Sequence, residues 1–386
     1  MTLTVKPTLQ TLTPEQMALV HELSLQVLER TGIRVDSAKT RRLLQQKLGA
    51  ALIQDDRARF PRQLVDWAIS TAPKTIEIYD RRGDLRFRLG NDRTRFGVGV
   101  TVLYYQDPLT DELVPFNRRH METTVRLGES LPNYDVISTV GILQDMPPER
   151  ADLYASLDML ANTVKPLVLL ISEDALFRKV LDMLEYIHGD LAARPFIIPY
   201  FNPVTPLILN EGTTDKMAAA IERGLPLIFS NYSLAGTTTP ITPMGLLVLM
   251  NAELLAGLVV SQLIKEGAPV ILGMLPAYFD MQTMVNFYDP LSILVSMAGA
   301  EMMSYYHLPH CGTSGSGTGW GPDLPAAETY WMNHLCSCLG KTGLAPFVGD
   351  TLTSKAISPA TIVYAHEVIT QALRLSQGFS LEGEED

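Results

Sequence analysis

The sequence is poor in cysteine and in positive charge, and both shortages exclude classes of protein. The 386 residues include three cysteines, Cys311, Cys336 and Cys338. So small and odd a number argues against a disulfide framework and suits a reducing compartment. Lys and Arg number 31 against 42 Asp and Glu, a formal net charge of −11. Nucleic acids and anionic membranes require clustered basic residues, so neither is expected as the main partner.

The N-terminus lacks the pattern of a signal peptide. Met1 to Gln10 has no apolar core behind basic residues, so a cytoplasmic location is expected. The most apolar stretch, Met244 to Leu263, resembles a membrane span in length. It carries Asn251, Glu253 and Gln262 and lies between turn signals, which favours a buried helix of a large α/β protein.

Residues 1–92 are predicted to form a helical cap that ends in a hairpin. Helix-start and helix-stop signals and an alternating apolar pattern mark its elements. These are helices at 13–32, at 37–48 and after Pro61, and hairpin strands at 76–79 and 85–89. Residues 93–386 are expected to form the second unit.

From about residue 95 a single unit repeats eight times, namely a short apolar run followed by an amphipathic helix. The expected strands are Phe96–Tyr105, Asp135–Leu143, Pro166–Ser172, Pro195–Phe201, Pro226–Tyr232, Pro269–Leu275, Leu308–Thr313 and Ala345–Thr351. The helical patterns that follow them are Arg118–Leu131, Arg150–Asn162, Ala175–His188, Thr214–Arg223, Gly245–Glu266, Leu291–Tyr306, Leu324–Leu339 and Ser358–Leu375.

The residues at the starts of the strands and the composition of the strands favour a closed α/β barrel. Several strands open with proline, as at Pro166 and Pro195, where the missing N–H costs no central ladder bond. Near-continuous apolar runs are typical of strands buried on both faces. Eight βα units favour a (β/α)₈ TIM barrel over an open doubly wound sheet. The first strand also lacks the Gly-x-Gly-x-x-Gly turn of a dinucleotide site.

The carboxyl ends of the strands, where such barrels hold their active sites, are rich in aromatic and amide side chains. They lack a Lys that could form a Schiff base, which disfavours a lyase or aldolase. Aromatic faces beside neutral polar groups suit a quaternary ammonium, which has no N–H to donate and is held by cation–π attraction. Ordinary core aromatics near a rim are the alternative. The strand-end side chains include Tyr104, Tyr105, Gln106, Tyr200, Asn202, Asn231, Tyr232, Tyr278, Trp320 and Asp350.

Histidines raise two further possibilities. His307, His310 and Cys311 could act as metal ligands, but Pro309 intervenes and the segment lies at the opposite, structural end of the barrel. No metal site is therefore expected. His334 follows strand seven on a helix. It either packs within the fold or, if the first turns of that helix border the site, hydrogen-bonds a ligand carboxylate or a water.

Five segments resemble the trimethylamine:corrinoid methyltransferase (MttB) family. The most specific block combines an Ala-Gly-x-Thr-x-Pro-x-Thr pattern with Ala-Glu-x-Leu-Ala-Gly and Gly-Ala-Pro elements. The resemblance covers most of the chain from about residue 14 to residue 380. The segments are 202–207 (NPVTPL), 233–245 (SLAGTTTPITPMG), 251–257 (NAELLAG), 267–270 (GAPV) and 323–328 (DLPAAE).

The resemblance is to the branch of the family without pyrrolysine. Members that use methylamines carry pyrrolysine shortly before the last of these segments, where this chain reads Gly319-Trp320-Gly321-Pro322. The resemblance implies methyl transfer from a quaternary amine, such as glycine betaine, to Co(I) of a corrinoid (cobalamin) cofactor carried by a separate corrinoid-binding protein. It also implies a homo-oligomer. A quaternary amine already has a neutral leaving group, so the pocket mainly orients the methyl group.

The resemblance and the strand-end pattern together predict eight site residues. An aromatic cage is expected from Tyr104, Tyr105 and Trp320, with Asn231, Tyr232 and Glu328 as further substrate-binding residues. Asn202 and His334 are the catalytic candidates, through contacts that orient the substrate or bind its carboxylate. The family usually continues for several dozen residues beyond the length of this chain. A catalytically silent barrel that binds betaine-like solutes, or an assembly subunit, is therefore the second interpretation.

Overall fold

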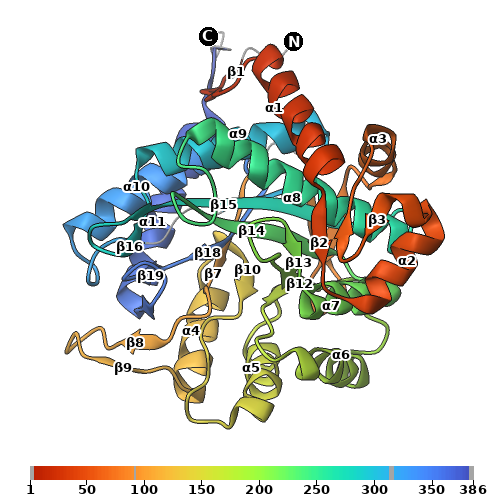
Figure 1. Ribbon diagram of the computed structural model, residues 1–386. Coiled ribbons are helices and arrows are strands. Elements are labelled where there is room, and N and C mark those ends of the chain that lie inside the picture. The colour runs from red at the N-terminus through yellow and green to blue at the C-terminus, as the bar shows by residue number, and fades with distance from the viewer. Residues whose placement is uncertain (1–3, 91–92, 313–316, 382–386) are drawn as a thin grey trace.

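Eight parallel strands close into a barrel in the computed structural model, which describes residues 4–90, 93–312 and 317–381 (Figure 1). In order around the ring they are β7 (Arg95–Val98), β10 (Tyr134–Ser138), β11 (Leu167–Leu169), β12 (Ile197–Phe201), β14 (Leu227–Ala235), β15 (Val270–Asp280), β17 (His310–Gly312) and β18 (Leu344–Val348). Parallel pairing of β18 with β7 completes the ring. The predicted (β/α)₈ architecture is confirmed.

A helix follows each strand, and the helices surround the barrel (Figure 1). Several begin where a side chain caps the first turn: Asn117, Asp289 and Asp323 each accept a hydrogen bond from the backbone N–H three residues on. The helices are α4 (Arg118–Ser130), α5 (Pro148–Asn162), α6 (Asp174–His188), α7 (Glu211–Glu222), α8 (Pro243–Ile264), α9 (Pro290–Tyr305), α10 (Leu324–Leu339) and α11 (Pro359–Gln377).

Helix α8 is the one helix among the described residues that is long and apolar enough to cross a membrane. Of its most apolar 18-residue window, 83% is buried inside the protein. It packs against β14, β15 and the N-terminal helices. A helix that is apolar all round suits such a core position.

The end of the barrel where the strands begin is closed by the hairpin of β5 (Ile76–Tyr79) and β6 (Leu85–Leu89). Ile78 and Phe87 of this hairpin belong to the same buried cluster as the inward-facing residues of the barrel strands. The backbone N–H of Tyr79 donates to the Pro195 carbonyl just before β12. The hairpin therefore fills the end of the barrel where the strands begin, and a ligand site is expected at the end where the strands finish.

The first strand of the barrel is shorter than the sequence suggested. The expected strand 96–105 ends at Val98, because Gly99 and Thr101 have φ values of +105° and +56° that break an extended chain. Tyr104–Gln106 instead forms β8. This strand belongs to a separate four-stranded sheet with β9 (Leu113–Pro115), β19 (Asp350–Thr351) and β20 (Ala356–Ile357). The last residue of the expected seventh strand, Thr313, lies outside the described residues.

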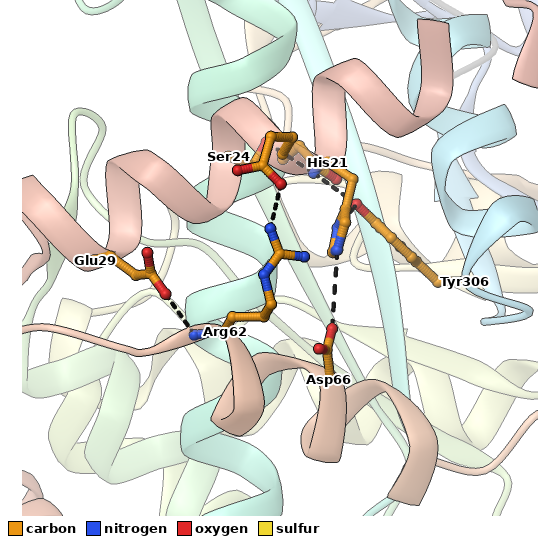
Figure 2. Close-up of polar contacts among 8 residues, drawn as sticks. His21, Ser24, Glu29, Arg62, Asp66 and Tyr306 are labelled. Carbon is orange, nitrogen blue, oxygen red and sulfur yellow. Dashed lines mark hydrogen bonds and ion pairs between the residues drawn. The ribbon is translucent and has the colours of Figure 1, made fainter. Parts of the chain in front are cut away.

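The N-terminal helices are tied to the barrel helices by a polar network (Figure 2). Tyr306, just after α9, lies 3.0 Å from His21 Nδ1 and accepts a hydrogen bond from Asn251 of α8. The Tyr306 hydroxyl proton is thus available to His21 Nδ1, which leaves Nε2–H facing the Asp66 carboxylate at 3.9 Å. Arg62 pairs with Glu22. The helices involved are α1 (Pro14–Gln26), α2 (Ala38–Leu48), which packs beside them, and α3 (Arg62–Thr71).

Candidate active site at the mouth of the barrel

The fourth strand carries an aromatic ring and an amide to the mouth, the end of the barrel where the strands finish. Ile198 and Tyr200 belong to the cluster inside the barrel, so strand alternation places Asn202 on the same side. Asn202 Nδ2 donates to the Tyr200 hydroxyl at 3.3 Å and to the Ser230 carbonyl at 3.0 Å. Burial raises the pKa of Tyr200, so its hydroxyl stays neutral. Its ring meets Phe347 edge to face at 5.1 Å.

A second group at the mouth forms because β15 runs far beyond the barrel wall and returns as β16 (Val285–Phe287). Asn286 on the returning strand donates from Nδ2 to the Tyr232 hydroxyl at 2.5 Å. Ile228 belongs to the cluster inside the barrel, so strand alternation places Ser230 and Tyr232 on the same side of β14. The hydroxyl of Tyr288 lies 3.4 Å from that of Tyr232. This hairpin therefore brings two side chains back to the end of β14.

Asp350 adds a carboxylate next to the eighth strand. It is the first residue of β19, two residues beyond the end of β18, and is fully buried. Its backbone carbonyl accepts hydrogen bonds from the Tyr330 hydroxyl and from the Gly317 N–H. Burial raises the pKa of Tyr288, and Tyr232 and the Asp350 carboxylate raise it further. Tyr288 thus lies between the end of β14 and the segment after β18.

The six side chains described above are three phenols, two amides and one carboxyl group. Phenols whose pKa is raised do not lose a proton near neutral pH, so Tyr200 and Tyr288 do not act as bases there. Ring faces and a carboxylate favour a cation. We call the following set the mouth cluster: Tyr200, Asn202, Tyr232, Asn286, Tyr288 and Asp350.

The three rings expected to form a cage lie in different surroundings. Tyr105 is buried and stacks on His120 at 4.1 Å, whereas Tyr104 is 39% exposed. Both belong to β8 rather than to a barrel strand. Trp320 lies in the loop before α10, where its backbone N–H donates to the Asp323 carboxylate, and the residue is 58% exposed. No ring contact joins any two of these three side chains in the part of the chain that the structure describes.

Three other predicted site residues make contacts outside the mouth cluster or are exposed to solvent. His334 is buried between Phe96, with ring centroids 5.7 Å apart, and Tyr330, at 5.6 Å. Burial lowers the pKa of His334 to about 3, so the ring is neutral. Asn231 donates to Glu253 of α8 at 2.8 Å, behind the barrel wall. Glu328 is exposed on α10. Asn202 and Tyr232 are the two nominated residues in the mouth cluster.

Sequence reasoning passed over four members of the mouth cluster. Strand alternation could have selected Tyr200, two residues before Asn202, and Asp350 was visible as a strand-end carboxylate. Asn286 and Tyr288 gave no local signal, because their position depends on the return of β16. Among the described residues, no three His, Cys, Asp or Glu side chains gather as metal ligands would.

Comparison with known proteins settles the family. The family model "Trimethylamine methyltransferase (MTTB)" matches residues 2–383. The chain belongs to this family. It is 26% identical to trimethylamine methyltransferase MttB of Desulfitobacterium hafniense, across 86% of this chain and 67% of that protein. It is 24% identical to a proline betaine:corrinoid methyltransferase of Eubacterium limosum, across 94% of this chain and 77% of that protein.

Further relatives agree with this assignment. A glycine betaine methyltransferase of D. hafniense is 24% identical, across 97% of this chain and 79% of that protein. The crystal structure of the Methanosarcina barkeri monomethylamine methyltransferase (MtmB) superposes with a TM-score of 0.64 at 8% identity, over 95% of this chain and 75% of that chain. The MtmB structure shares the fold. Family membership makes this chain a methyltransferase of a family that acts on methylated amines.

Proposed function

We propose that this methyltransferase removes a methyl group from a quaternary amine, glycine betaine or a close analogue, and transfers it to Co(I) of a corrinoid held by a separate protein. The relatives named for proline betaine and glycine betaine support a quaternary amine, and the word corrinoid in the first name supports the acceptor. The observation that carries the proposal is the mouth cluster, in which Asn202 joins Tyr200 to the end of β14 and the hydroxyl of Tyr288 lies beside that of Tyr232.

The mouth cluster supplies what a quaternary ammonium needs. Its fixed positive charge has no N–H to donate, so ring faces bind it through cation–π attraction of about 0.5–2 kcal/mol each. Asp350 adds a carboxyl group beside Tyr288. The Tyr232 hydroxyl accepts from Asn286, so its own proton is available to a substrate carboxylate. These contacts fix the direction of the N–methyl bond.

The reaction needs orientation and no proton transfer. The carbon–nitrogen bond breaks with its electron pair left on nitrogen, which releases a neutral tertiary amine. The methyl group bonds to the Co(I) acceptor through the electron pair that the metal supplies. Alignment of the methyl group with the acceptor is therefore the main task of the protein. Because the product amine has lost its fixed charge, cation–π attraction no longer retains it. The absence of lysine from Gly319–Pro322 agrees with a substrate that needs no covalent adduct.

A substrate panel tests this function. The purified protein is mixed with Co(I) cobalamin and, separately, with glycine betaine, proline betaine, tetramethylammonium and trimethylamine, while the absorbance of Co(I) and of methyl-Co(III) is followed. Methylation of cobalamin by the betaines and not by trimethylamine is expected. Turnover of trimethylamine alone would contradict the proposal. Betaine binding without any methyl transfer would favour a silent solute-binding barrel instead.

A further inference from the structure

The end of the barrel opposite the mouth carries a cavity that methyl transfer does not use. Its volume is about 650 Å³, within the range typical of small-molecule sites. N-terminal residues 6–9, the residues that follow α9 and α10, and the chain before β18 surround it. We call it the floor cavity. The lining residues used below are Lys6, Thr8, Lys74, His310 and Lys341.

The charge of the floor cavity is opposite to that of the whole protein. The chain has a formal charge of −11, yet the lining includes three lysines and, among the described residues, no Asp or Glu. One lysine is already used: Lys74 donates to the carbonyls of Ile69 and Tyr306, at the ends of α3 and α9. A cation at a helix C-terminus is the ordinary structural use of lysine.

Lys6 and Lys341, in contrast to Lys74, do not bind the carbonyls at a helix end that the structure describes. Within the described residues, neither ammonium group forms an ion pair or a hydrogen bond, although both line the floor cavity. Two ammonium groups that share one hollow repel each other, and an anion between them would remove that repulsion. The cavity thus offers unpaired positive charge in a protein whose net charge is negative.

His310 supplies a second, independent observation. It is 3% exposed and forms part of the cavity wall. Neither of its ring nitrogens has a hydrogen-bond partner among the residues that the structure describes. Buried polar groups are normally paired, so a ring nitrogen without a partner in a cavity wall indicates a missing ligand or solvent contact.

We propose that the floor cavity binds a small anionic metabolite through phosphate or carboxylate groups. Lys6 and Lys341 pair with the anion, and the Thr8 hydroxyl and a His310 ring N–H donate to it. The ligand would hold the N-terminal residues against the end of α10. Lys6 directly follows β1 (Thr4–Val5), which pairs with β21 (Phe379–Ser380), so binding would also secure the paired ends of the chain (Figure 1). This site is independent of the proposed methyl transfer.

Calorimetry and thermal unfolding test the site on the whole protein. The probes are inorganic phosphate, pyrophosphate, AMP and citrate, with sodium chloride at matched ionic strength as the blank. We expect saturable binding and a raised Tm for at least one probe. A response to the phosphates alone identifies a phosphate site, and a response to citrate alone identifies a carboxylate site. No saturable binding by any probe would overturn the proposal.

Paired variants locate the binding. The double variant Lys6→Gln/Lys341→Gln is expected to weaken the best probe at least tenfold. The matched control Lys47→Gln, at an exposed lysine on α2, should leave the affinity unchanged. Both lysines of the double variant are exposed, and circular dichroism verifies that it is folded. Equal affinity in the wild type and the double variant, or an equal loss in the Lys47 control, would show that the binding is not at the floor cavity.

Discussion

Replacement of His334 by phenylalanine separates a packing role from a substrate-binding role. Burial lowers the pKa of His334 to about 3 from its ordinary value of 6.5. The folded protein therefore rejects a proton that the unfolded chain accepts. Stability from the neutral ring is complete above pH 6.5 and is lost as the pH falls below it. Each pH unit costs about 1.4 kcal/mol, so the loss between pH 6.5 and pH 5 is about 2 kcal/mol.

The buried His310 has the same direction and size of shift, with its pKa lowered to about 3. The wild type should then lose about 4 kcal/mol from the two rings together at pH 5. His334→Phe keeps a ring between Phe96 and Tyr330 and removes two nitrogens that lack partners, so stability at pH 7.5 should hold or rise. The variant should therefore lose about 2 kcal/mol less than the wild type at pH 5.

Urea unfolding at pH 7.5, 6.5, 5.5 and 5.0 measures the dependence, and methyl transfer is assayed at pH 7.5. Trp331→Phe, at a half-exposed ring on the same helix, controls for any change to α10. A packing role predicts a shallower pH dependence with methyl transfer retained. An unaltered pH dependence, or loss of methyl transfer at unchanged stability, would refute the reasoning and return His334 to the substrate.

Variants at three further positions test whether Tyr288, Trp320 and Asn231 contact the substrate. Tyr288→Ala should weaken tetramethylammonium binding by about 1–2 kcal/mol in calorimetry while Tyr288→Phe keeps most of the affinity, and equal affinities would exclude the ring from a cage. Trp320→Ala removes an exposed ring and should cost about 0.5–1 kcal/mol of the same affinity; no change would place Trp320 outside the site. Asn231→Ala breaks two buried hydrogen bonds to α8 and should lower stability by about 1–3 kcal/mol with an unchanged KM for betaine. A raised KM at constant Tm would argue for substrate contact.

The barrel could be predicted because its signals are local. Each strand is a short apolar run with a turn before it, and the bounds of α10 and of the hairpin β5–β6 agree with the sequence pattern. The predicted range of the first strand is too long because the apolar run 96–105 continues through Gly99 and Thr101. Only the positive φ values at these residues end the strand, and a composition pattern does not contain them.

The candidate site was harder to predict because its geometry is not local. Asn202 and Tyr232 follow from strand ends, whose direction is fixed by alternation along the chain. Tyr288 reaches the mouth cluster only because β15 continues past the wall and folds back. The orientation of His334 depends on which face of α10 packs on the barrel. Ten helical residues, 324–333, separate it from the loop that holds the exposed Trp320. Sequence spacing alone does not decide whether His334 lies on the packed face of α10 or on the face toward the mouth.

The composition of the mouth cluster follows from the chemistry proposed for it. A general base would need a pKa near the working pH, yet burial drives the pKa of Tyr200 and Tyr288 upward. Such an environment is unfavourable for proton transfer and favourable for a cation that has no proton to lose. The same apolar surroundings strengthen attraction to ring faces and to Asp350, because little water competes. The fixed positive charge on nitrogen accounts for the affinity for the substrate. Loss of that charge on methyl transfer accounts for the release of the product.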